Sequence, residues 1–410
     1  MSQTLRQFWT LLADFPAFRK IWLSHLASLL GDWLSYIAVA VLSISSGKGA
    51  VPVALVMVAH TVPTMLISPF AGILADRYDR RGLILISYLG AGLLTVGMWA
   101  ASSLESIWLL QSVLFLRVAV SSLGLNARSA ALPALVGRDN LHQANALLGL
   151  SWSVMFALGL ALGGLVSSIL SPAGAIALDA STFLVAAWIA RGLPKLLPPT
   201  EKKQRGADSG GLDIVWQYVF KRPKLFAYVF AKTPATIVNA GAWVTLNLVA
   251  GERLTSLGTA LALGMMQCTR ALGTGVGPLL PTWVLPRNPF AGVLLMFVGI
   301  GIFAYFEPVW SSLVGLFLWG AGGGHNWVVA TVCVQENSPD EMLGRISALD
   351  SLMFSMGSTV AALIAGFTCD YFGAPAAGTW VPMGLAFVVW IGVLFQYRRG
   401  VTLEASQSNR

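Results

Sequence analysis

Charged residues are scarce in this chain of 410 residues, in which Asp, Glu, Lys and Arg together make up 11% and hydrophobic residues make up 56%. A typical soluble domain is roughly 25% charged. The low charge therefore excludes an ordinary soluble domain. The long apolar runs predict an all-α integral membrane protein, because a helix satisfies its own backbone hydrogen bonds within lipid.

Several chemical motifs are also missing. Cys268, Cys333 and Cys369 are isolated in or beside apolar segments, which excludes a disulfide framework and a cysteine zinc site. There is no phosphate-binding ATP loop, no His-Glu-x-x-His zinc helix and no Gly-x-Ser-x-Gly nucleophile elbow. We therefore expect neither an enzyme nor an ATP-driven pump, and neither a cofactor nor a bound metal. The polar start, Met1 to Lys20, predicts no cleavable signal peptide.

The apolar sequence divides into segments of the length that a membrane-spanning helix needs, which is about 20 residues. The dividing points are clusters of charged residues, proline and glycine. Twelve spans are predicted in this way, at 21–45, 51–75, 83–103, 107–130, 143–170, 173–192, 225–250, 255–280, 289–306, 309–335, 346–369 and 374–397.

Basic residues are distributed unevenly between the two sides of this predicted bundle. Most of the 26 Lys and Arg lie in alternate connectors, on the side that also holds both termini, whereas the opposite connectors hold Lys48 and Arg253. Because positively charged loops stay in the cytoplasm, both termini are predicted to be cytoplasmic, in a plasma membrane or a Gram-negative inner membrane. This asymmetry, rather than nucleic-acid binding, explains the net charge of +8.

One long polar connector divides the chain into two halves of six spans each. The predicted parts are an N-terminal bundle at 1–193, a cytoplasmic linker at 194–224, and a C-terminal bundle with a cytoplasmic tail at 225–410. Within the linker, apolar residues between Leu212 and Val219 recur at helical spacing, which predicts a short helix lying on the membrane surface. Weak repetition between two six-span halves is typical of transporters that work by alternating access.

The segment from Gly72 to Arg81, which joins the second and third predicted spans, resembles the signature loop of the major facilitator superfamily. Other segments look like the branch of this superfamily that contains the enterobactin exporter and macrolide efflux pumps, namely Phe18-Arg19, Gly31-Asp32, Leu178-Asp179-Ala180 and Leu343-Gly344-Arg345. The resemblance implies two pseudo-symmetric six-helix bundles, and we expect a monomer. Two positions depart from the pattern: Asp79 replaces the usual turn glycine, and the fifth span lacks the proline of the antiporter motif.

The same resemblance implies a conformational latch on the cytoplasmic side. Asp76 stands at a helix end, where it can accept hydrogen bonds from nearby N–H groups and pair with Arg128 or Arg345. The alternative is a loop whose charges merely orient the protein. The residues assigned to the latch are Gly72, Asp76, Arg77, Arg80, Arg81, Arg128 and Arg345.

Two charged residues are predicted to meet near the middle of the first bundle. Asp32 in the first span and Arg117 in the fourth stand at comparable depth, and the resemblance places both spans at a central cavity. Charges within spans usually face a cavity or a partner. Three interpretations of Asp32 are open: a structural ion pair, a carboxylate that couples transport to a proton or another cation, and a direct ligand of the solute. Asp179 resembles a structural family position and is not included in this site.

The second half contributes further polar residues within spans, namely Lys232, Asn239, Trp243, Arg270, His325 and Asn326. Together with Arg117, Lys232 and Arg270 outnumber Asp32, which is the clearest anion. The site is therefore predicted to favour an anionic or amphipathic solute. Alternatively, Lys232 and Arg270 extend to the cytoplasmic interface. His325 either titrates near neutral pH or is a hydrogen-bonded structural residue.

The leading hypothesis is a secondary active transporter that exports a siderophore or an amphipathic drug-like molecule by proton antiport. Its expected partners are a small-molecule solute, a proton or another coupling ion, and the lipid bilayer. Export of a divalent metal is an alternative, because Gly31-Asp32 also resembles the start of ferroportins. Lysophospholipid flipping and a membrane-embedded enzyme or sensor are further alternatives.

Overall fold

A computed structural model describes residues 3–197 and 212–408 of the chain. Every regular element among these residues is a helix, as predicted for an all-α membrane protein. The α-helices are α1 (Gln3–Asp14), α2 (Pro16–Ser45), α3 (Val51–Arg77), α4 (Arg80–Ser103), α5 (Ile107–Val136), α6 (Leu141–Ala190), α7 (Leu212–Phe220), α8 (Pro223–Val229), α9 (Lys232–Arg253), α10 (Gly258–Val276), α11 (Pro289–Tyr305), α12 (Val309–Asn337), α13 (Asp340–Phe372) and α14 (Ala377–Ser408). The short 3-10 helices η2 (Thr255–Leu257) and η3 (Gly277–Leu279) flank α10.

The helices group into two compact units. Unit 1 consists of Met1–Gly47, Ala59–Gly206 and Ser256–Cys268, and unit 2 consists of Lys48–Val58, Ala207–Thr255 and Thr269–Arg410. The first residues of α3 belong to unit 2, where the Asp370 carboxylate accepts hydrogen bonds from the backbone N–H groups of Ala50 (2.6 Å) and Val51 (3.2 Å). Asp370 thus satisfies free donors at the start of α3, as an N-cap side chain does.

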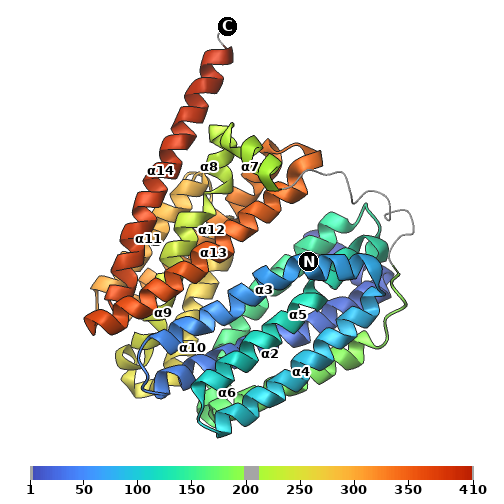
Figure 1. Cartoon of the computed structure of the whole chain (residues 1–410), viewed down its shortest axis with the longest axis vertical. Coiled ribbons are helices and arrows are strands. Elements are labelled where there is room, and N and C mark those ends of the chain that lie inside the picture. Colours follow the sequence, from blue (N-terminus) through green and yellow to red (C-terminus); the bar gives the residue numbers. More distant parts are fainter. Residues whose placement is uncertain (1–2, 198–211, 409–410) are drawn as a thin grey trace. The chain divides into compact units, whose positions relative to one another are not determined.

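In unit 1, α4 packs against α5 and α6, and α2 lies along α6 (Figure 1). Glycines on α6 allow the close approach of α2. A Cβ atom at Gly159 would lie 2.5 Å from Cβ of Trp33, and one at Gly163 would lie 3.1 Å from the backbone oxygen of Trp33. Small residues at a helix interface let two backbones approach closely. The close contact between α2 and α6 therefore requires glycine, which has no side chain, at both positions.

The fifth and sixth predicted spans form one element of 50 residues, α6, with a sharp break at Ser171. Ser171 has φ 74° and ψ 160°, which are not helical values, and Pro172 follows it. A residue before proline is disfavoured in the α region, and proline has no N–H group to continue the helical hydrogen bonds. The break separates two helical segments close to the predicted spans 143–170 and 173–192.

In unit 2, α9 packs against α13 and α14, while α11 packs against α12. Glycines of α12 also bring it against the backbone of α10. A Cβ atom at Gly320 would lie 1.9 Å from the backbone oxygen of Arg270, and one at Gly324 would lie 2.0 Å from that of Thr274. Glycine is therefore required at both positions for the observed spacing of the two helices.

The linker helix forms where the apolar spacing predicts it, and part of its apolar face packs on the protein. Its contact with the membrane surface stays a prediction. Val215 and Val219 of α7 are buried in one core cluster with Leu225 of α8 and Leu349 of α13. An amphipathic helix buries its apolar stripe on whichever apolar surface is available, and here α8 and α13 supply that surface. The part of the predicted linker at 198–211, with its run of Lys and Arg, lies outside the described residues.

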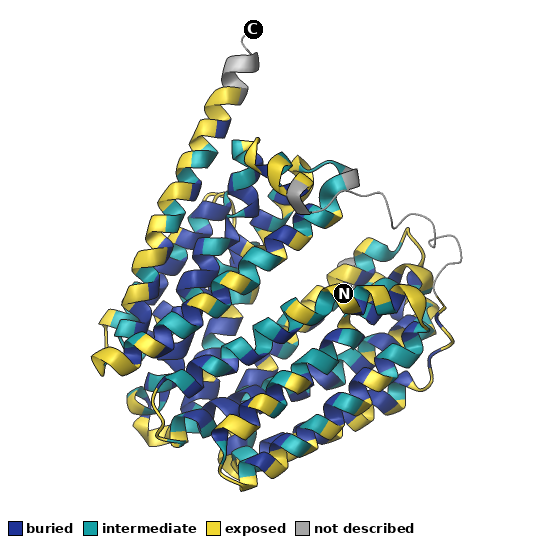
Figure 2. Ribbon diagram, in the orientation of Figure 1, coloured by how far each residue is buried: buried dark blue, intermediate teal, exposed yellow. Residues whose placement is uncertain are grey.

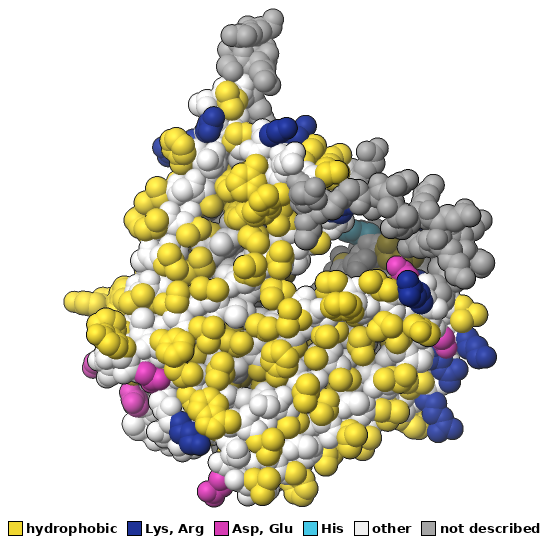
Figure 3. All heavy atoms as spheres, viewed as in Figure 1, with side chains coloured by type: hydrophobic (Ala, Val, Ile, Leu, Met, Phe, Trp, Pro, Cys, Tyr) yellow, Lys and Arg dark blue, Asp and Glu magenta, His cyan; other side chains and the backbone are white. Residues whose placement is uncertain are grey.

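Seven helices in the described part of the chain are long and apolar enough to cross a membrane, namely Pro16–Ser45, Val51–Arg77, Arg80–Ser103, Ile107–Val136, Leu141–Ala190, Met342–Phe372 and Ala377–Leu403. The count of twelve spans stays a prediction. Each long helix combines buried and exposed faces (Figure 2). Hydrophobic side chains cover much of the visible helix surface, with Lys and Arg near helix ends (Figure 3). Such a surface suits contact with lipid.

Candidate functional site

An ion cluster lies inside unit 1. Arg117 of α5 is 1% exposed, and its Nη2 atom donates a hydrogen bond to Oδ1 of Asp32 on α2. The same nitrogen lies 3.6 Å from Oδ2 of Asp179 on α6. The ring of Phe183 covers the guanidinium group, with 5.0 Å between the ring centroid and Cζ. Three helices thus bring one cation and two carboxylates together, and we call Arg117, Asp32 and Asp179 the Arg117 cluster.

A glycine beside Asp32 makes this arrangement possible. A Cβ atom at Gly31 would lie 2.0 Å from Oδ1 of Asp179 and 2.1 Å from Oγ1 of Thr182. Thr182 itself donates a hydrogen bond of 3.2 Å to Oδ1 of Asp179. Gly31 is therefore the reason that α2 approaches α6 closely enough for Asp32 and Asp179 to reach the same arginine.

The two carboxylates of the cluster differ in exposure, because the side chain of Asp32 is 36% exposed and that of Asp179 is 0% exposed. The Asp32–Arg117 pair expected from the sequence is present in the structure, and its role in coupling stays a prediction. Asp179, which the sequence analysis left outside the site as a structural residue, also lies beside Arg117. The available signal was a carboxylate inside an apolar span, which needs a partner.

A second ion pair lies in unit 2. Nζ of Lys232, at the start of α9, donates a hydrogen bond of 2.5 Å to Oδ2 of Asp350 on α13. The ammonium group also lies 4.5 Å from the ring centroid of Trp327. Both charged side chains are nearly buried, with exposed fractions of 6% and 9%. Lys232 is therefore neutralised within unit 2 by a nearly buried carboxylate.

Three other predicted site residues come together in unit 2. Cζ of Arg270 lies 3.8 Å from the ring centroid of Trp243 and 5.2 Å from that of Trp319. Nε1 of Trp319 donates a hydrogen bond of 3.1 Å to Oδ1 of Asn239. We call Arg270, Trp243, Trp319 and Asn239 the Arg270 group. Trp319 was missed because an aromatic residue in an apolar span cannot be distinguished from ordinary core by its sequence context.

His325 and Asn326 both contact backbone carbonyl groups in unit 2, and their contact with a solute stays a prediction. Nε2 of His325 lies 3.0 Å from the backbone oxygen of Pro286. Nδ2 of Asn326 donates hydrogen bonds to the backbone oxygens of Ala231 (3.1 Å) and Pro289 (3.0 Å). Both side chains are buried. Polar groups in such positions are normally satisfied by the neighbouring backbone, and these two tie α12 to the segments before α9 and α11.

The cations of the predicted site have more acidic neighbours than the sequence analysis counted. Beside two of the three predicted site cations, Arg117 and Lys232, the structure places three carboxylates, of which the sequence analysis had counted Asp32 alone. Because these carboxylates offset the three cations, the net charge of the predicted site residues no longer favours a strongly anionic solute.

Within residues 3–197 and 212–408, no group of three or more His, Cys, Asp or Glu could hold a metal ion.

The signature loop between α3 and α4 is held inside unit 1 by bonds that differ from the predicted latch. Asp76 near the end of α3 lies 4.0 Å from Arg80 at the start of α4. The expected ion pair between Asp76 and Arg128 is not present among the described residues. Arg128 is buried, and a Cβ atom at Gly72 would meet open space. Arg345 belongs to unit 2. The latch role of this loop stays a prediction.

Asp79 holds the loop more directly than Asp76 does. Its Oδ1 atom accepts hydrogen bonds from the N–H of Arg81 (3.2 Å), at the start of α4, and from the N–H of Leu196 (2.8 Å), after α6. Nη2 of Arg81 in turn donates to the carbonyl of Arg191 (2.8 Å). The sequence analysis recorded Asp79 only as a missing glycine, although an aspartate just before a helix is a common N-cap signal.

Replacing Asp79 with alanine is expected to lower the free energy of unfolding by about 0.5–2 kcal/mol, because α4 loses its side-chain cap. Thermal unfolding of the purified protein in detergent measures the effect. Asp76→Ala is the matched control, since Asp76 is 59% exposed in a 4.0 Å pair. Such surface pairs contribute about 0–1 kcal/mol. A larger loss of stability in Asp76→Ala than in Asp79→Ala would contradict this assignment.

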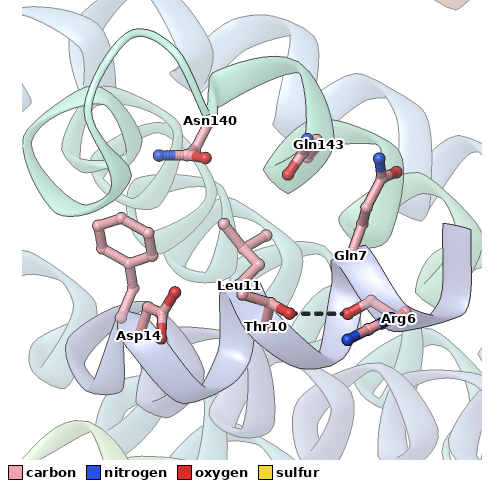
Figure 4. Close-up of a pocket in the computed structure, with 8 residues that line it drawn as sticks. Arg6, Gln7, Thr10, Leu11, Asp14, Asn140 and Gln143 are labelled. Atoms are coloured by element: carbon pink, nitrogen blue, oxygen red, sulfur yellow. Dashed lines mark hydrogen bonds between the residues drawn. The ribbon is translucent and has the colours of Figure 1, made fainter. Parts of the chain in front are cut away.

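A pocket of about 410 Å³ lies between α1 and the start of α6 (Figure 4). Its lining includes Arg6 and Asp14 of α1, and Asn140 and Gln143 from the start of α6. Oγ1 of Thr10 donates a hydrogen bond of 3.0 Å to the backbone oxygen of Arg6. No residue of the Arg117 cluster or of the Arg270 group lines this pocket, which is therefore separate from both.

Comparison with known sequences gives one consistent result. Residues 21–349 match the family described as the Major Facilitator Superfamily. The chain is 27% identical to the enterobactin exporter EntS of Citrobacter koseri over 417 aligned residues, which cover 96% of this chain and 97% of that protein. It is 26% identical to the enterobactin exporter EntS of Salmonella typhimurium, with 96% of this chain and 98% of that protein covered.

Solved structures show the same architecture. The nucleoside transporter NupG superposes with a TM-score of 0.71 at 13% identity, covering 93% of this chain and 99% of that one. A bacterial homologue of the iron transporter ferroportin, in an inward-facing state, superposes with a TM-score of 0.66 at 16% identity, covering 92% and 98%. At these identities the likeness concerns the fold alone, and a shared fold does not specify a solute.

Proposed function

Because the chain belongs to the major facilitator superfamily, we propose that this multi-pass membrane transporter of a small molecule is a secondary active exporter. In this proposal it works by alternating access and couples outward movement of the solute to inward movement of protons. The solute is a siderophore or another amphipathic molecule with aromatic groups. Two features of the described residues support the proposal, one for the proton and one for the solute.

Proton coupling depends mainly on the Arg117 cluster. Asp32 is partly exposed and is bonded to an arginine that is almost fully buried. Ionisable groups inside membrane spans are costly, so they usually mark an ion pathway or a solute site. When Asp32 binds a proton, Arg117 loses an ionic partner, and the charge of the cluster changes. A transporter can use such a change to bind solute and proton at different stages of its cycle.

The solute class is supported by the relatives named as enterobactin exporters and by the Arg270 group. In this structure Arg270 stacks on Trp243 and Trp319, and all three side chains are buried. In this proposal an aromatic ring of the solute stacks on these flat groups when the transport cycle exposes them. Asn239 is the partly exposed member of this group, and its amide adds a hydrogen-bonding group. This combination suits a catechol or another aromatic ring with oxygen substituents better than a simple anion.

Transport by purified protein in liposomes tests the proposal, with enterobactin as the probe and an imposed pH gradient as the driving force. We expect gradient-dependent movement of enterobactin by the unmodified protein. We expect Asp32→Asn to abolish the dependence on the gradient while it still binds enterobactin. Full pH-driven transport by Asp32→Asn would exclude the coupling role, and transport of Fe²⁺ or Mn²⁺ instead of enterobactin would favour the divalent-metal alternative.

Replacing Trp243 with alanine is expected to raise the KM for enterobactin roughly 30-fold, because a desolvated cation–π contact contributes about 2 kcal/mol and about 1.4 kcal/mol corresponds to a factor of ten. Initial rates in the liposome assay measure the change. Trp283→Ala is the matched control, since Trp283 is 86% exposed and lies outside the Arg270 group. An unchanged KM in Trp243→Ala, with normal folding, would remove the Arg270 group from the solute site.

A further inference from the structure

We propose that Asp179 is a second proton-binding carboxylate, and that Asp179 and Asp32 share one proton across Arg117. The transport role of this proton rests on the proposed function, whereas the binding of the proton can be tested without any solute. The inference depends on three properties of the Arg117 cluster: its charge, its exposure and the contacts of its arginine.

The cluster contains more acidic than basic groups. Arg117 contributes one positive charge, and the two carboxylates contribute two negative charges when both are ionised. An uncompensated charge inside a membrane-spanning bundle is costly. One bound proton restores neutrality. Two carboxylates that face one cation are therefore expected to retain a single proton, which belongs to the pair rather than to either residue.

Among the described residues, the Arg117 cluster has no ion pair other than the two that it contains. Away from the helix ends, the remaining titratable side chains on these helices are His25 and Tyr36 on α2, His60 on α3, Tyr88 on α4 and Arg128 on α5. Tyr88 donates a hydrogen bond of 3.4 Å to Oγ of Ser24, and His60 stacks edge-on with Tyr36. His25 lies near Arg128.

The two carboxylates differ in whether water can reach them, so a proton from water reaches one before the other. Asp32, at 36% exposed, is the carboxylate that water can reach, while Asp179 is 0% exposed. Nη2 of Arg117 contacts both, and Nε of Arg117 has no hydrogen-bond partner among the described residues. The guanidinium group is therefore free to strengthen its contact with Asp179 when Asp32 accepts a proton, and to return to Asp32 when the proton leaves.

This exchange gives Asp179 a positioning role in transport. With the proton on Asp32, the Arg117–Asp179 pair is neutral and links α5 to α6. With the proton on Asp179, the Arg117–Asp32 pair is neutral and links α5 to α2. The proton thus changes which helix α5 is bonded to, and no metal or other cofactor is needed for the change.

The proposal is tested by measuring proton binding to the purified protein in detergent. Potentiometric titration between about pH 5 and 9 counts the bound protons, and infrared spectroscopy detects protonated carboxyl groups. The unmodified protein should bind about one more proton per molecule than either Asp179→Asn or Asp32→Asn, because each variant leaves one carboxylate for one arginine. Thr182→Val is the control. It removes the hydroxyl beside Asp179 but no carboxylate, and it should retain the proton.

Two results would overturn the proposal. One is full proton uptake by Asp179→Asn, which would leave Asp32 as the sole site. The other is a protonated carboxyl signal that persists in Asp32→Asn, which would mean that Asp179 holds a proton by itself. The second result needs no Asp179 variant and so stands even if Asp179→Asn fails to fold. Failure of enterobactin transport with normal proton uptake would reject the proposed function and leave this inference intact.

Discussion

Replacing Lys232 with methionine is expected to lower the free energy of unfolding by roughly 3–5 kcal/mol. The change removes the partner of Asp350, whose carboxylate accepts the 2.5 Å hydrogen bond from Lys232 and is 9% exposed. An unpaired carboxylate at such a site must either remain charged without compensation or take up a proton. Thermal or denaturant unfolding in detergent, with the loss of helical circular dichroism as the signal, measures the effect.

The double variant Lys232→Met with Asp350→Leu is the control. Replacing both members of a buried ion pair with apolar residues of similar volume is often neutral or stabilising. Most of the lost stability should therefore return in the double variant, giving a large favourable coupling between the two substitutions. Equal or additive losses in the single and double variants would show that Lys232 stabilises unit 2 through its packing on Trp327 rather than through Asp350.

Replacing Gly320 with alanine is expected to destabilise unit 2 by about 1–3 kcal/mol or more, the usual range for overpacking. The new methyl group would lie 1.9 Å from the backbone oxygen of Arg270 and 2.9 Å from the backbone nitrogen of Thr274. Because these are backbone atoms, α10 and α12 must separate to admit it. The Arg270 group lies on these helices and on α9, so the KM for enterobactin should rise together with the loss of stability.

Gly323→Ala is the matched control on the same helix. The atoms nearest to a Cβ at Gly323 lie 3.8 Å away, in the flexible side chain of Met296, which is an ordinary contact. In a helix interior alanine is more favourable than glycine by up to about 1 kcal/mol. The same substitution three residues apart should therefore stabilise at one position and destabilise at the other. Similar changes in melting temperature at both positions would show that the helices do not pack as closely as described.

The helix positions could be predicted from the sequence to within a few residues in most cases. Span 289–306 corresponds to α11 (Pro289–Tyr305), and span 309–335 corresponds to α12 (Val309–Asn337). Prolines and glycines act locally, so their effect on where a helix starts or stops is visible in the sequence. The family was also visible, because the signature loop is a continuous segment.

The ion-pair partners could not be predicted in the same way. Arg117 and Asp179 are 62 residues apart, and Lys232 and Asp350 are 118 residues apart, so no local pattern connects them. Assigning these pairs requires the rotation of each helix about its axis and the identity of its neighbour. Both depend on how the helices pack. At the Arg117 cluster, α2 can lie close to Asp179 because Gly31 has no side chain.

The class of protein, its helices and its family thus follow from the order of the residues, because membrane insertion and helix formation respond to composition and to local breaks. The balance of buried charge follows only from tertiary structure, which pairs Asp179 with Arg117 and Asp350 with Lys232. A charge inside lipid has the same cost in any sequence context, but whether it is neutralised depends on which side chain lies within a few ångströms in the folded protein.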